Sequence, residues 1–328
     1  MANAMARVIL LSETGGPEKL VMTQAEVGTP RAGEIRLRQT AIGVNYHDIY
    51  VRNGLYRTLA LPGVPGIEAV GFVEEVGEGV EGLSVGDRVG YVSGGYGAYA
   101  DQRILPAALA LKIPDWMSDV QAAATLMKSL TACALLRRVH KVTAGQTVLI
   151  HAAAGGMGQL LGRWASALGA IVIGTVGSEA KAGVARGAGA NHVILYREDD
   201  TAKLARELTG GHGVDVVFDA VGADTFQSSL DSLGFCGHLV NFGQASGPVA
   251  PVSLQTLAAR SLTLSRPIIF HYIRTAQLLR EMAQETFAAF DVGSIKPIDP
   301  IVLSMGQAPQ AHLMLEQRQS PGGIVLVP

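Results

Sequence analysis

The stretch His151-Ala-Ala-Ala-Gly155-Gly156-Met157-Gly158 decides the fold expected for the second half of this chain. It follows the apolar run Thr147–Ile150 and precedes a helical pattern over 159–168 that ends at Gly169. A strand, a glycine turn and a helix in this order present backbone N–H groups and the positive helix end to a pyrophosphate. The turn therefore predicts a dinucleotide site at Ala154, Gly155, Gly156, Met157 and Gly158.

The sequence around this turn strengthens the prediction, because one glycine turn is also typical of an ordinary strand-to-helix loop in other α/β domains. A second apolar run at 171–176 completes a βαβ unit. Beyond it, strands alternate with helical stretches, which predicts a doubly wound parallel sheet of the Rossmann type. The expected strands cover 147–152, 171–176, 192–196, 214–220, 237–242 and 262–266.

The first third of the chain has a different pattern. Short β-type runs at 6–11, 34–38, 69–76 and 87–92 are separated by Gly-containing turns, which predicts a partly closed β-barrel. Helical periodicity then begins near Ser118, with Ser118 or Asp119 as the N-cap, and continues past Arg138. We therefore expect two domains, 1–124 and 125–267. Segment 268–328, with a helix expected at 274–289 and a strand at 323–327, is expected to belong to the first domain.

Composition excludes several classes of protein. The 328 residues carry a formal net charge of −2, with 48% hydrophobic and 16% charged residues, and no basic stripe indicates nucleic acid. No apolar run approaches the length of a signal peptide core or a transmembrane span. With only two cysteines, Cys133 and Cys236, expected in a helix and a loop, a disulfide framework is excluded. A reducing cytoplasm is the expected compartment.

The residues after the second strand favour NADPH over NADH. An NAD site of this kind has an acid there for the ribose 2′-OH, whereas this strand ends in Gly177-Ser178. Ser178 and Lys181 are one helical turn apart and suit a 2′-phosphate, with Tyr196 packing beside the adenosine. Two alternatives stay open: Glu179 takes the acid role and selects NAD, or Lys181 is simply a solvated helix residue.

Further motifs resemble those of quinone oxidoreductases related to zeta-crystallin, in the medium-chain dehydrogenase/reductase superfamily. The segment Ala41–Tyr56 resembles their active-site segment, and the similarity continues in order along essentially the whole chain. No single motif is specific, but the set is. The other matching motifs are Pro65–Gly71, Val85–Val89, Met127–Thr131, Ala152–Gly158, Phe218–Gly222 and Phe242-Gly243. The resemblance implies a GroES-like barrel domain beside the Rossmann domain.

Zinc dependence, common elsewhere in this superfamily, is not expected for this chain. A catalytic zinc requires Cys and His ligands with an open coordination position. At the equivalent segments the chain has Asn45 in place of a thiolate and Ile67-Glu68 in place of a His-Glu pair. His47 has no matching partner ligands, and we interpret it as a polar residue lining or flanking the cleft. We therefore expect no bound metal.

The resemblance also implies roles for individual residues. Asn45, Tyr50 and Tyr56 are expected to flank the nicotinamide and the substrate as catalytic residues. A tyrosine hydroxyl either donates a hydrogen bond or proton to the acceptor, or only packs there. Lys128 is expected on the nicotinamide side, unless it caps or bridges the domains. The remaining cofactor contacts are expected at Asn45, Asp48, Thr131, Val221, Phe242, Gly243, Gln244, Arg266 and Arg318. For Arg318 the alternative is a surface charge.

Together these observations predict an NADPH-dependent quinone reductase. A quinone accepts electrons through its own conjugation, so the protein mainly positions it against nicotinamide C4. An alkenal or enone reductase using the same site is the enzymatic alternative. A low-turnover crystallin-like or RNA-binding protein is the non-enzymatic one, and the absence of a basic patch argues against RNA. Family resemblance implies a homodimer, with 261–265 and 268–270 as candidate contacts that could equally be buried in the monomer.

Overall fold

The chain forms two compact units in the computed structural model, which describes residues 4–320 and 322–328. The first unit consists of the residues up to Met127 with 274–283 and 297–328, and the second of 128–273 with 284–296. The sequence suggested that the whole of segment 268–328 belongs to the first unit, but only part of it does. Residues 268–273 and 284–296 belong to the second unit, because helical periodicity does not reveal which body a helix packs against.

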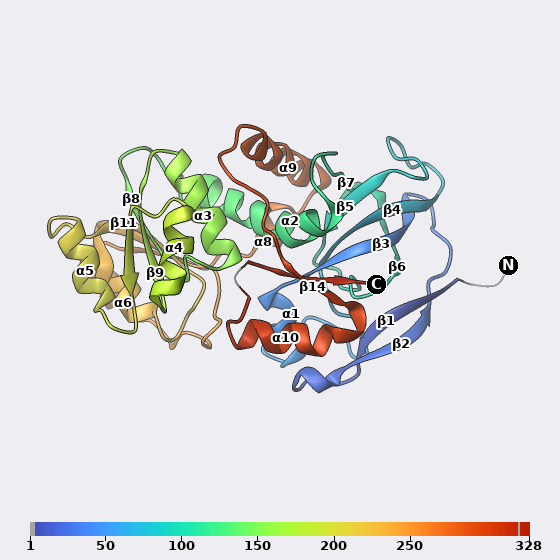
Figure 1. Ribbon diagram of the computed structural model, residues 1–328, viewed down its shortest axis with the longest axis horizontal. Helices are drawn as coiled ribbons and strands as arrows, with labels where there is room; N and C mark the ends of the chain where they lie inside the picture. The colour runs from blue at the N-terminus through green and yellow to red at the C-terminus, as the bar shows by residue number, and fades with distance from the viewer. Residues whose placement is uncertain (1–3, 321) are drawn as a thin grey trace. The chain divides into compact units, whose positions relative to one another are not determined.

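The second unit contains a six-stranded sheet in which every neighbouring pair is parallel. The strand order is β10-β9-β8-β11-β12-β13, which is the Rossmann order with the first strand of the series in the middle. This confirms the doubly wound sheet predicted from sequence. Figure 1 labels β8, β9 and β11 of this sheet. The strands are β8 (Thr147–Ile150), β9 (Ile171–Val176), β10 (His192–Leu195), β11 (Val214–Asp219), β12 (Leu233–Asn241) and β13 (Thr263–Ser265).

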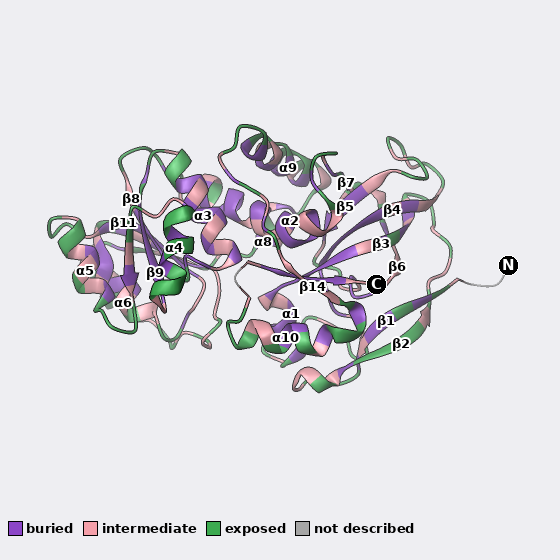
Figure 2. Ribbon diagram, in the orientation of Figure 1, coloured by how far each residue is buried: buried purple, intermediate pink, exposed green. Residues whose placement is uncertain are grey.

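Side chains without polar atoms make up the main cluster in the core of this sheet, as a parallel sheet covered by helices requires, although Thr175 and Asp219 on its strands are buried as well. Leu149, Ile173, Val217 and Leu239 come from four adjacent strands and are fully buried in one cluster. Figure 2 shows these strands largely buried, while α4 and α5 expose their outer faces. The helices of this unit are α3 (Gly156–Ala167), α4 (Glu179–Gly187), α5 (Thr201–Leu208), α6 (Phe226–Ser232), α7 (Leu254–Ala258) and α8 (Ile269–Tyr272).

The first unit is built on a mainly antiparallel sheet in the order β14-β15-β3-β4-β5-β7, with β6 also paired to β3 and a separate β1-β2 hairpin. The C-terminal strand β15 pairs antiparallel with β3. These sheets form the GroES-like domain. The strands are β1 (Met5–Leu11), β2 (Leu20–Glu26), β3 (Glu34–Val44), β4 (Glu68–Val76), β5 (Arg88–Val92), β6 (Gln102–Pro106), β7 (Leu111–Lys112), β14 (Ile301–Ser304) and β15 (Ile324–Val327).

Two helices lie wholly in the first unit, and two more contribute residues to both units. The first pair is α1 (Tyr46–Arg52) and α10 (Ala308–Glu316), and the second pair is α2 (Asp119–Ala134) and α9 (Ala276–Asp291). At Leu135–Val139 the helical region after α2 continues as a π-helix. None of the helices in the described parts of the chain has the length and apolar character that crossing a bilayer requires.

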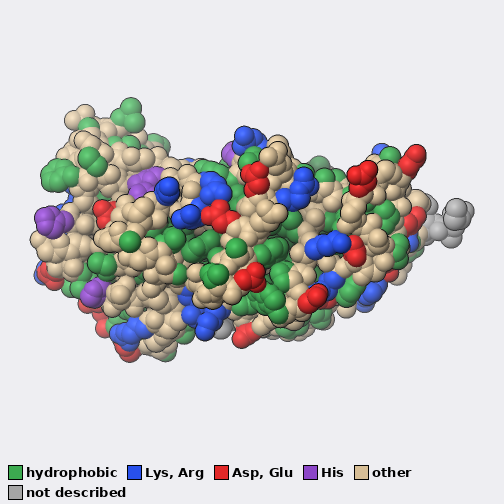
Figure 3. Space-filling view, turned by 90° about the horizontal axis from the view of Figure 1, so that it is seen from above, with side chains coloured by type: hydrophobic (Ala, Val, Ile, Leu, Met, Phe, Trp, Pro, Cys, Tyr) green, Lys and Arg blue, Asp and Glu red, His purple; other side chains and the backbone are tan. Residues whose placement is uncertain are grey.

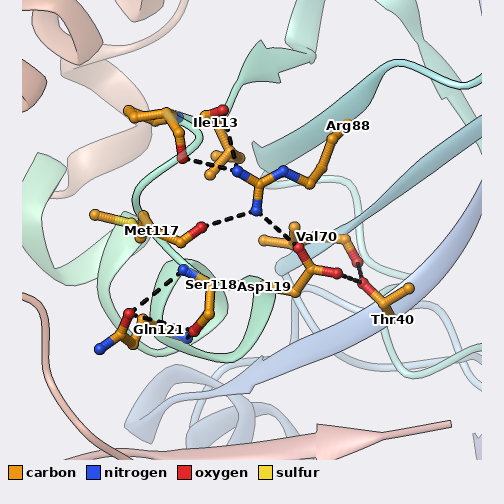
Figure 4. Close-up of polar contacts among 9 residues, drawn as sticks. Thr40, Val70, Arg88, Ile113, Met117, Ser118, Asp119 and Gln121 are labelled. Carbon is orange, nitrogen blue, oxygen red and sulfur yellow. Dashed lines mark hydrogen bonds and ion pairs between the residues drawn. The ribbon is translucent and has the colours of Figure 1, made fainter.

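The start of α2 is fixed by two sets of polar contacts (Figure 4). The Ser118 hydroxyl accepts a hydrogen bond from the Gln121 N–H at 3.2 Å, so Ser118 is the N-cap, one of the two predicted candidates. Asp119 instead accepts from the guanidinium of Arg88 at 3.0 Å and from the hydroxyl of Thr40 at 2.6 Å. The first turn of the helix is thereby bound to strands β3 and β5.

Local details differ from the sequence-based expectations. Strand β8 ends at Ile150, before the expected residue 152, because the backbone turns there to begin the glycine loop. Cys236 lies within β12, not in a loop, and its side chain is exposed at a left-handed backbone position, φ 59°. On the face shown in Figure 3, acidic and basic side chains are interspersed, in keeping with the near-zero net charge.

Candidate functional site

The glycine turn between β8 and α3 brings backbone atoms unusually close together. A Cβ placed on Gly158 would lie 2.4 Å from the Ala152 carbonyl oxygen and 2.6 Å from the Ala153 Cα, so only glycine fits. Ala152 itself has a positive φ of 52°, which is strained for a residue with a side chain. Helix α3 begins at Gly156, so its free N–H groups lie at the turn. The turn has the form of an anion cradle.

The end of the next strand, β9, supplies polar and cationic groups. A Cβ on Gly177 would meet the Tyr196 hydroxyl at 2.8 Å and the Arg197 Nε at 3.4 Å, so both side chains lie against this glycine. Ser178 is the N-cap residue of α4, and exposed Lys181 is in its first turn. Arg197 is a cation that sequence reasoning missed, and its place directly after Tyr196 was the available signal.

Glu179, the alternative acid for an NAD site, is engaged elsewhere. Its Oε1 lies 3.2 Å from Nη1 of Arg186 on the same helix, and both side chains are mostly exposed. An exposed ion pair of this kind is weak. The geometry nevertheless leaves the end of β9 with a hydroxyl, a phenol and two nearby cations, which suits a phosphate better than a ribose hydroxyl.

Two loops follow the neighbouring strands β11 and β12. Buried Asp219 accepts hydrogen bonds from the N–H groups of Val221 and Gly222 at 2.7 and 3.1 Å, so this carboxylate orders the loop. A Cβ on Gly243 would lie 2.4 Å from the Ala220 carbonyl oxygen, so the second loop packs directly on the first. Phe242 and Gln244 flank this contact and are half-buried.

Arg266, predicted as a cofactor ligand, has a structural partner in this unit. Its Nη1 donates to the Asn241 side-chain oxygen at 2.8 Å, the Asn241 carbonyl at 3.1 Å and the Gly243 carbonyl at 2.9 Å. The guanidinium therefore holds the end of β12 in shape. The predicted cofactor residues of the second unit share one feature. Each lies just after the carboxyl end of a parallel strand, the edge where ligands bind in such sheets, and the strands concerned are β8, β9, β10, β11, β12 and β13.

In the first unit, the two positions weighed as metal ligands bond to each other. The Asn45 side-chain amide donates to Glu68 Oε1 at 2.7 Å, and the Met127 N–H donates to Glu68 Oε2 at 2.8 Å. Glu68 is fully buried. Among the described residues, no group of three or more His, Cys, Asp or Glu side chains is placed to hold a metal ion.

Asp48 anchors the start of α1 from a buried position. Its Oδ2 accepts from the Asn45 N–H at 2.8 Å and from the Tyr99 hydroxyl at 3.2 Å. The Tyr99 oxygen is also 2.9 Å from Nε2 of His312, and since its single proton is used on Asp48, His312 must donate. Burial, with a smaller contribution from Arg52, lowers the pKa of His312 to about 3, so it is neutral at pH 7. Asp48 thus positions Asn45.

The predicted tyrosines lie together on and after α1. The rings of Tyr50 and Tyr56 are edge to face with centroids 5.0 Å apart, and the Tyr56 N–H donates to the Tyr50 carbonyl at 2.8 Å. Tyr50 is buried, whereas Tyr56 is half-buried. Sequence reasoning missed Tyr96, whose ring stacks on His47 at a centroid distance of 5.8 Å. Its signal was the glycine-rich loop 94–97.

Three predicted cofactor residues lie on or just after helices other than α1, rather than after strands. Lys128 and Thr131 are half-buried on α2, one turn apart, and Lys128 is the first residue of the second unit. Arg318 follows α10 in the first unit, exposed and at a left-handed φ of 59°. Its positive charge lowers the pKa of Tyr46, although burial raises that pKa more strongly.

Two family models match the chain. Residues 31–115 match the alcohol dehydrogenase GroES-like domain, and residues 156–284 match the zinc-binding dehydrogenase family. These matches cover the antiparallel sheet and most of the parallel sheet, respectively.

Full-length relatives narrow the assignment. The chain is 43% identical over 328 residues to a quinone oxidoreductase of Salmonella typhimurium, covering 99% of this chain and 100% of the relative. It is 42% identical to a 2-haloacrylate reductase of Burkholderia sp, covering 99% of each. The structure of the Escherichia coli quinone oxidoreductase, solved in complex with NADPH, matches with a TM-score of 0.94 at 41% identity, covering 98% of this chain and 100% of that one.

The full-length relatives cover 99% of this chain, so the similarity extends across both units. The resemblance inferred from motifs is therefore confirmed: this chain belongs to the quinone oxidoreductase family of enzymes, within the medium-chain dehydrogenase/reductase superfamily.

Proposed function

We propose that this chain reduces quinones with electrons from NADPH. The observation that carries the proposal is the cradle at Gly158, where an added Cβ would overlap backbone atoms at 2.4 and 2.6 Å, so that only glycine lets the turn close tightly enough to present its N–H groups to a pyrophosphate. Relatives that are 41% to 43% identical over almost the full chain and named quinone oxidoreductases support it.

The residues of the second unit fit the parts of NADPH in the order of the strands. The turn Ala154–Gly158 would hold the pyrophosphate, and Ser178, Lys181, Tyr196 and Arg197 would hold the 2′-phosphate and adenosine. The loops at Val221 and 242–244, kept in place by Asp219 and Arg266, would face the nicotinamide side. When bound, NADPH supplies the transferred electrons from nicotinamide C4. Lys128 and Thr131 would contribute from α2.

On the acceptor side, we infer that the tyrosines act on the oxygen of the substrate. Tyr56 is half-buried beside Tyr50, so its hydroxyl can reach an acceptor and donate a hydrogen bond or a proton to the reduced oxygen. Asn45, held by Asp48 and Glu68, would keep the start of α1 in a fixed position for substrate and nicotinamide. A conjugated acceptor needs mainly such positioning.

The test is NADPH oxidation by the purified, chelator-treated protein with a series of quinones. We expect turnover with quinones, faster with NADPH than with NADH. An absence of turnover with every quinone, in a preparation that binds NADPH, would contradict the proposal.

The relative named 2-haloacrylate reductase supports a second candidate, reduction of an activated C=C bond in the same site. Quinones and such alkenes are both flat and electron-poor. A comparison of kcat/KM between a quinone, 2-cyclohexen-1-one and 2-chloroacrylate separates the two activities. Higher kcat/KM for either alkene than for every quinone would make alkene reduction the function.

We also propose that the chain is a homodimer. Strand β13 is an edge of the parallel sheet, and Ile268 just after it is 48% exposed. An edge strand with an exposed apolar neighbour suits pairing with a second copy. Light scattering after size-exclusion chromatography should give twice the mass of 34.3 kDa, and a monomer at micromolar concentration would refute the dimer.

A further inference from the structure

A hydrogen-bonded chain of three side chains lies beside the catalytic tyrosines of the first unit. His47 is on α1, Tyr96 is in the glycine-rich loop after β5, and Thr58 follows Tyr56. Nε2 of His47 is 2.9 Å from the Tyr96 hydroxyl, which is also hydrogen-bonded to the hydroxyl of Thr58. The function proposed above gives none of these three residues a role, and we call them the His47–Tyr96–Thr58 chain.

Aromatic rings connect this chain to the proposed acceptor site. The Tyr50 and Tyr56 centroids are 5.0 Å apart, those of Tyr56 and His47 are 5.5 Å apart, and those of His47 and Tyr96 are 5.8 Å apart. The rings therefore form one continuous row with the Tyr96 hydroxyl at its far end.

All three members of the chain are neutral at pH 7. Burial lowers the pKa of His47 to about 4. Burial also raises the pKa of Tyr96, which therefore stays protonated. The guanidinium of Arg103 donates to the backbone carbonyls of Tyr96 and Gly95 at 3.0 and 3.2 Å. The three side chains themselves can thus offer hydrogen bonds to an oxygen atom but carry no positive charge for a carboxylate; the exposed cation next to them in the chain is Arg57.

The proton positions in this chain can run in either direction. In one arrangement His47 Nε2–H donates to Tyr96, Tyr96 donates to Thr58, and the Thr58 proton is available to a ligand. In the other, Thr58 donates to Tyr96 and Tyr96 donates to His47, so that Thr58 can accept. A neutral imidazole allows both, because its proton can reside on either nitrogen. Thr58 is exposed, so its hydroxyl is the open end.

We propose that the His47–Tyr96–Thr58 chain is a subsite for the second oxygen of a quinone. It donates a hydrogen bond to the carbonyl of the oxidised acceptor and accepts one from the hydroxyl that reduction creates. Tyr50 and Tyr56 hydrogen-bond to the first oxygen of the quinone. The quinone ring packs against the aromatic row between its two oxygens. This inference rests on the proposed function and sharpens it: two-oxygen quinones are preferred over enones with one carbonyl and over acrylates with a carboxylate.

The test compares acceptors in variants that lose one hydroxyl. Tyr96→Phe keeps the ring, and Thr58→Val keeps the size. The quinone is tetramethyl-1,4-benzoquinone, whose blocked ring carbons cannot add the exposed thiol of Cys236. The other acceptors are 2-cyclohexen-1-one and 2-chloroacrylate. The control is Tyr46→Phe, a tyrosine of α1 whose hydroxyl donates to the Leu315 carbonyl at 2.8 Å.

Both test variants should lower kcat/KM for the quinone by about two- to tenfold, which is the range for one neutral hydrogen bond. This fall should come from a higher KM rather than from a lower kcat. They should leave kcat/KM for the other two acceptors within about twofold, and the control should leave all three unchanged relative to one another. An equal fall for all acceptors, or no fall for the quinone, overturns the subsite.

Equilibrium dialysis of the quinone against the same variants separates this inference from the proposed function. A two- to tenfold weaker Kd in Tyr96→Phe supports the subsite even if no acceptor is turned over. An unchanged Kd overturns the subsite even if the quinone is reduced rapidly. Arg57→Gln checks the exposed cation next to Thr58. If it alone abolishes quinone binding, charge rather than the hydroxyls recognises the acceptor, and the subsite is wrong.

Discussion

Gly158→Ala should weaken NADPH binding without preventing folding. The new Cβ would lie 2.4 Å from the Ala152 oxygen, 2.6 Å from the Ala153 Cα and 2.8 Å from the Ala153 carbonyl carbon. All three are backbone atoms of the turn itself, so no side chain can rotate away. The turn must open, and the N–H groups that would face the pyrophosphate move with it.

The magnitude follows from two opposing contributions. Overpacking of this kind costs about 1–3 kcal/mol. Replacing glycine by alanine inside a helix returns about 0.5–1 kcal/mol, since Gly158 lies in α3. The difference is about 0–2.5 kcal/mol, and a cost in the upper part of this range, about 1–2 kcal/mol, taken from binding raises the Kd for NADPH roughly 5- to 30-fold.

Fluorescence titration with NADPH measures the Kd, and thermal unfolding measures stability. Gly183→Ala is the matched control, because it lies in α4 with nothing within 4 Å of an added Cβ. It should leave the Kd unchanged and add about 0.5–1 kcal/mol of stability. If Gly158→Ala binds NADPH as tightly as the wild type while folded, the reasoning about the cradle is refuted.

The other predictions concern cofactor choice, proton donation and pH. Lys181→Ala should reduce the preference for NADPH over NADH in kcat/KM, and an unaltered preference would exclude a role in phosphate recognition. Tyr56→Phe should lower kcat about 10²-fold and Tyr50→Phe less, because a general acid contributes at least that much; wild-type turnover in both would rule out a donor. The pKa of His312, lowered by burial from 6.5 to about 3, means that the unfolded chain binds more protons between these values, so stability falls as the pH drops from 6.5 toward 3. His312→Gln should reduce this slope by up to ~1.4 kcal/mol per pH unit in urea unfolding at pH 4 to 6, and an identical slope would show that His312 is not buried neutral.

Features with a local cause were predictable from the sequence. The turn at Gly158 is recognisable because a backbone approach of this kind admits only glycine, and the parallel strands are continuous apolar runs. Ser118 was a candidate cap because its hydroxyl serves an N–H three residues later in the chain. The absence of zinc ligands at Asn45 and Glu68 was visible, but their hydrogen bond to each other was not.

Features that depend on distant segments were not predictable. Arg266 matches a cofactor position, yet its guanidinium donates to Asn241 at the end of the neighbouring strand β12 and to Gly243 in the loop that follows, contacts set by sheet order rather than by local pattern. Tyr96 joins Tyr50 and Tyr56, the tyrosines proposed to act on the acceptor, only because its loop returns to α1. The same reason explains the wrong boundary at the C-terminal segment, since the Glu285 partners are Arg137 and Arg138, almost 150 residues earlier.

The division of the chain into units has a consequence for the evolution of this protein. The backbone passes from one unit to the other after residues 127, 273, 283 and 296. Recombination that exchanged only the continuous stretch 128–273 between homologues would separate Arg137 and Arg138 from Glu285, which would come from the other parent. Neither unit is encoded by one uninterrupted piece of gene, so the exchange of a single continuous segment cannot transfer either unit whole.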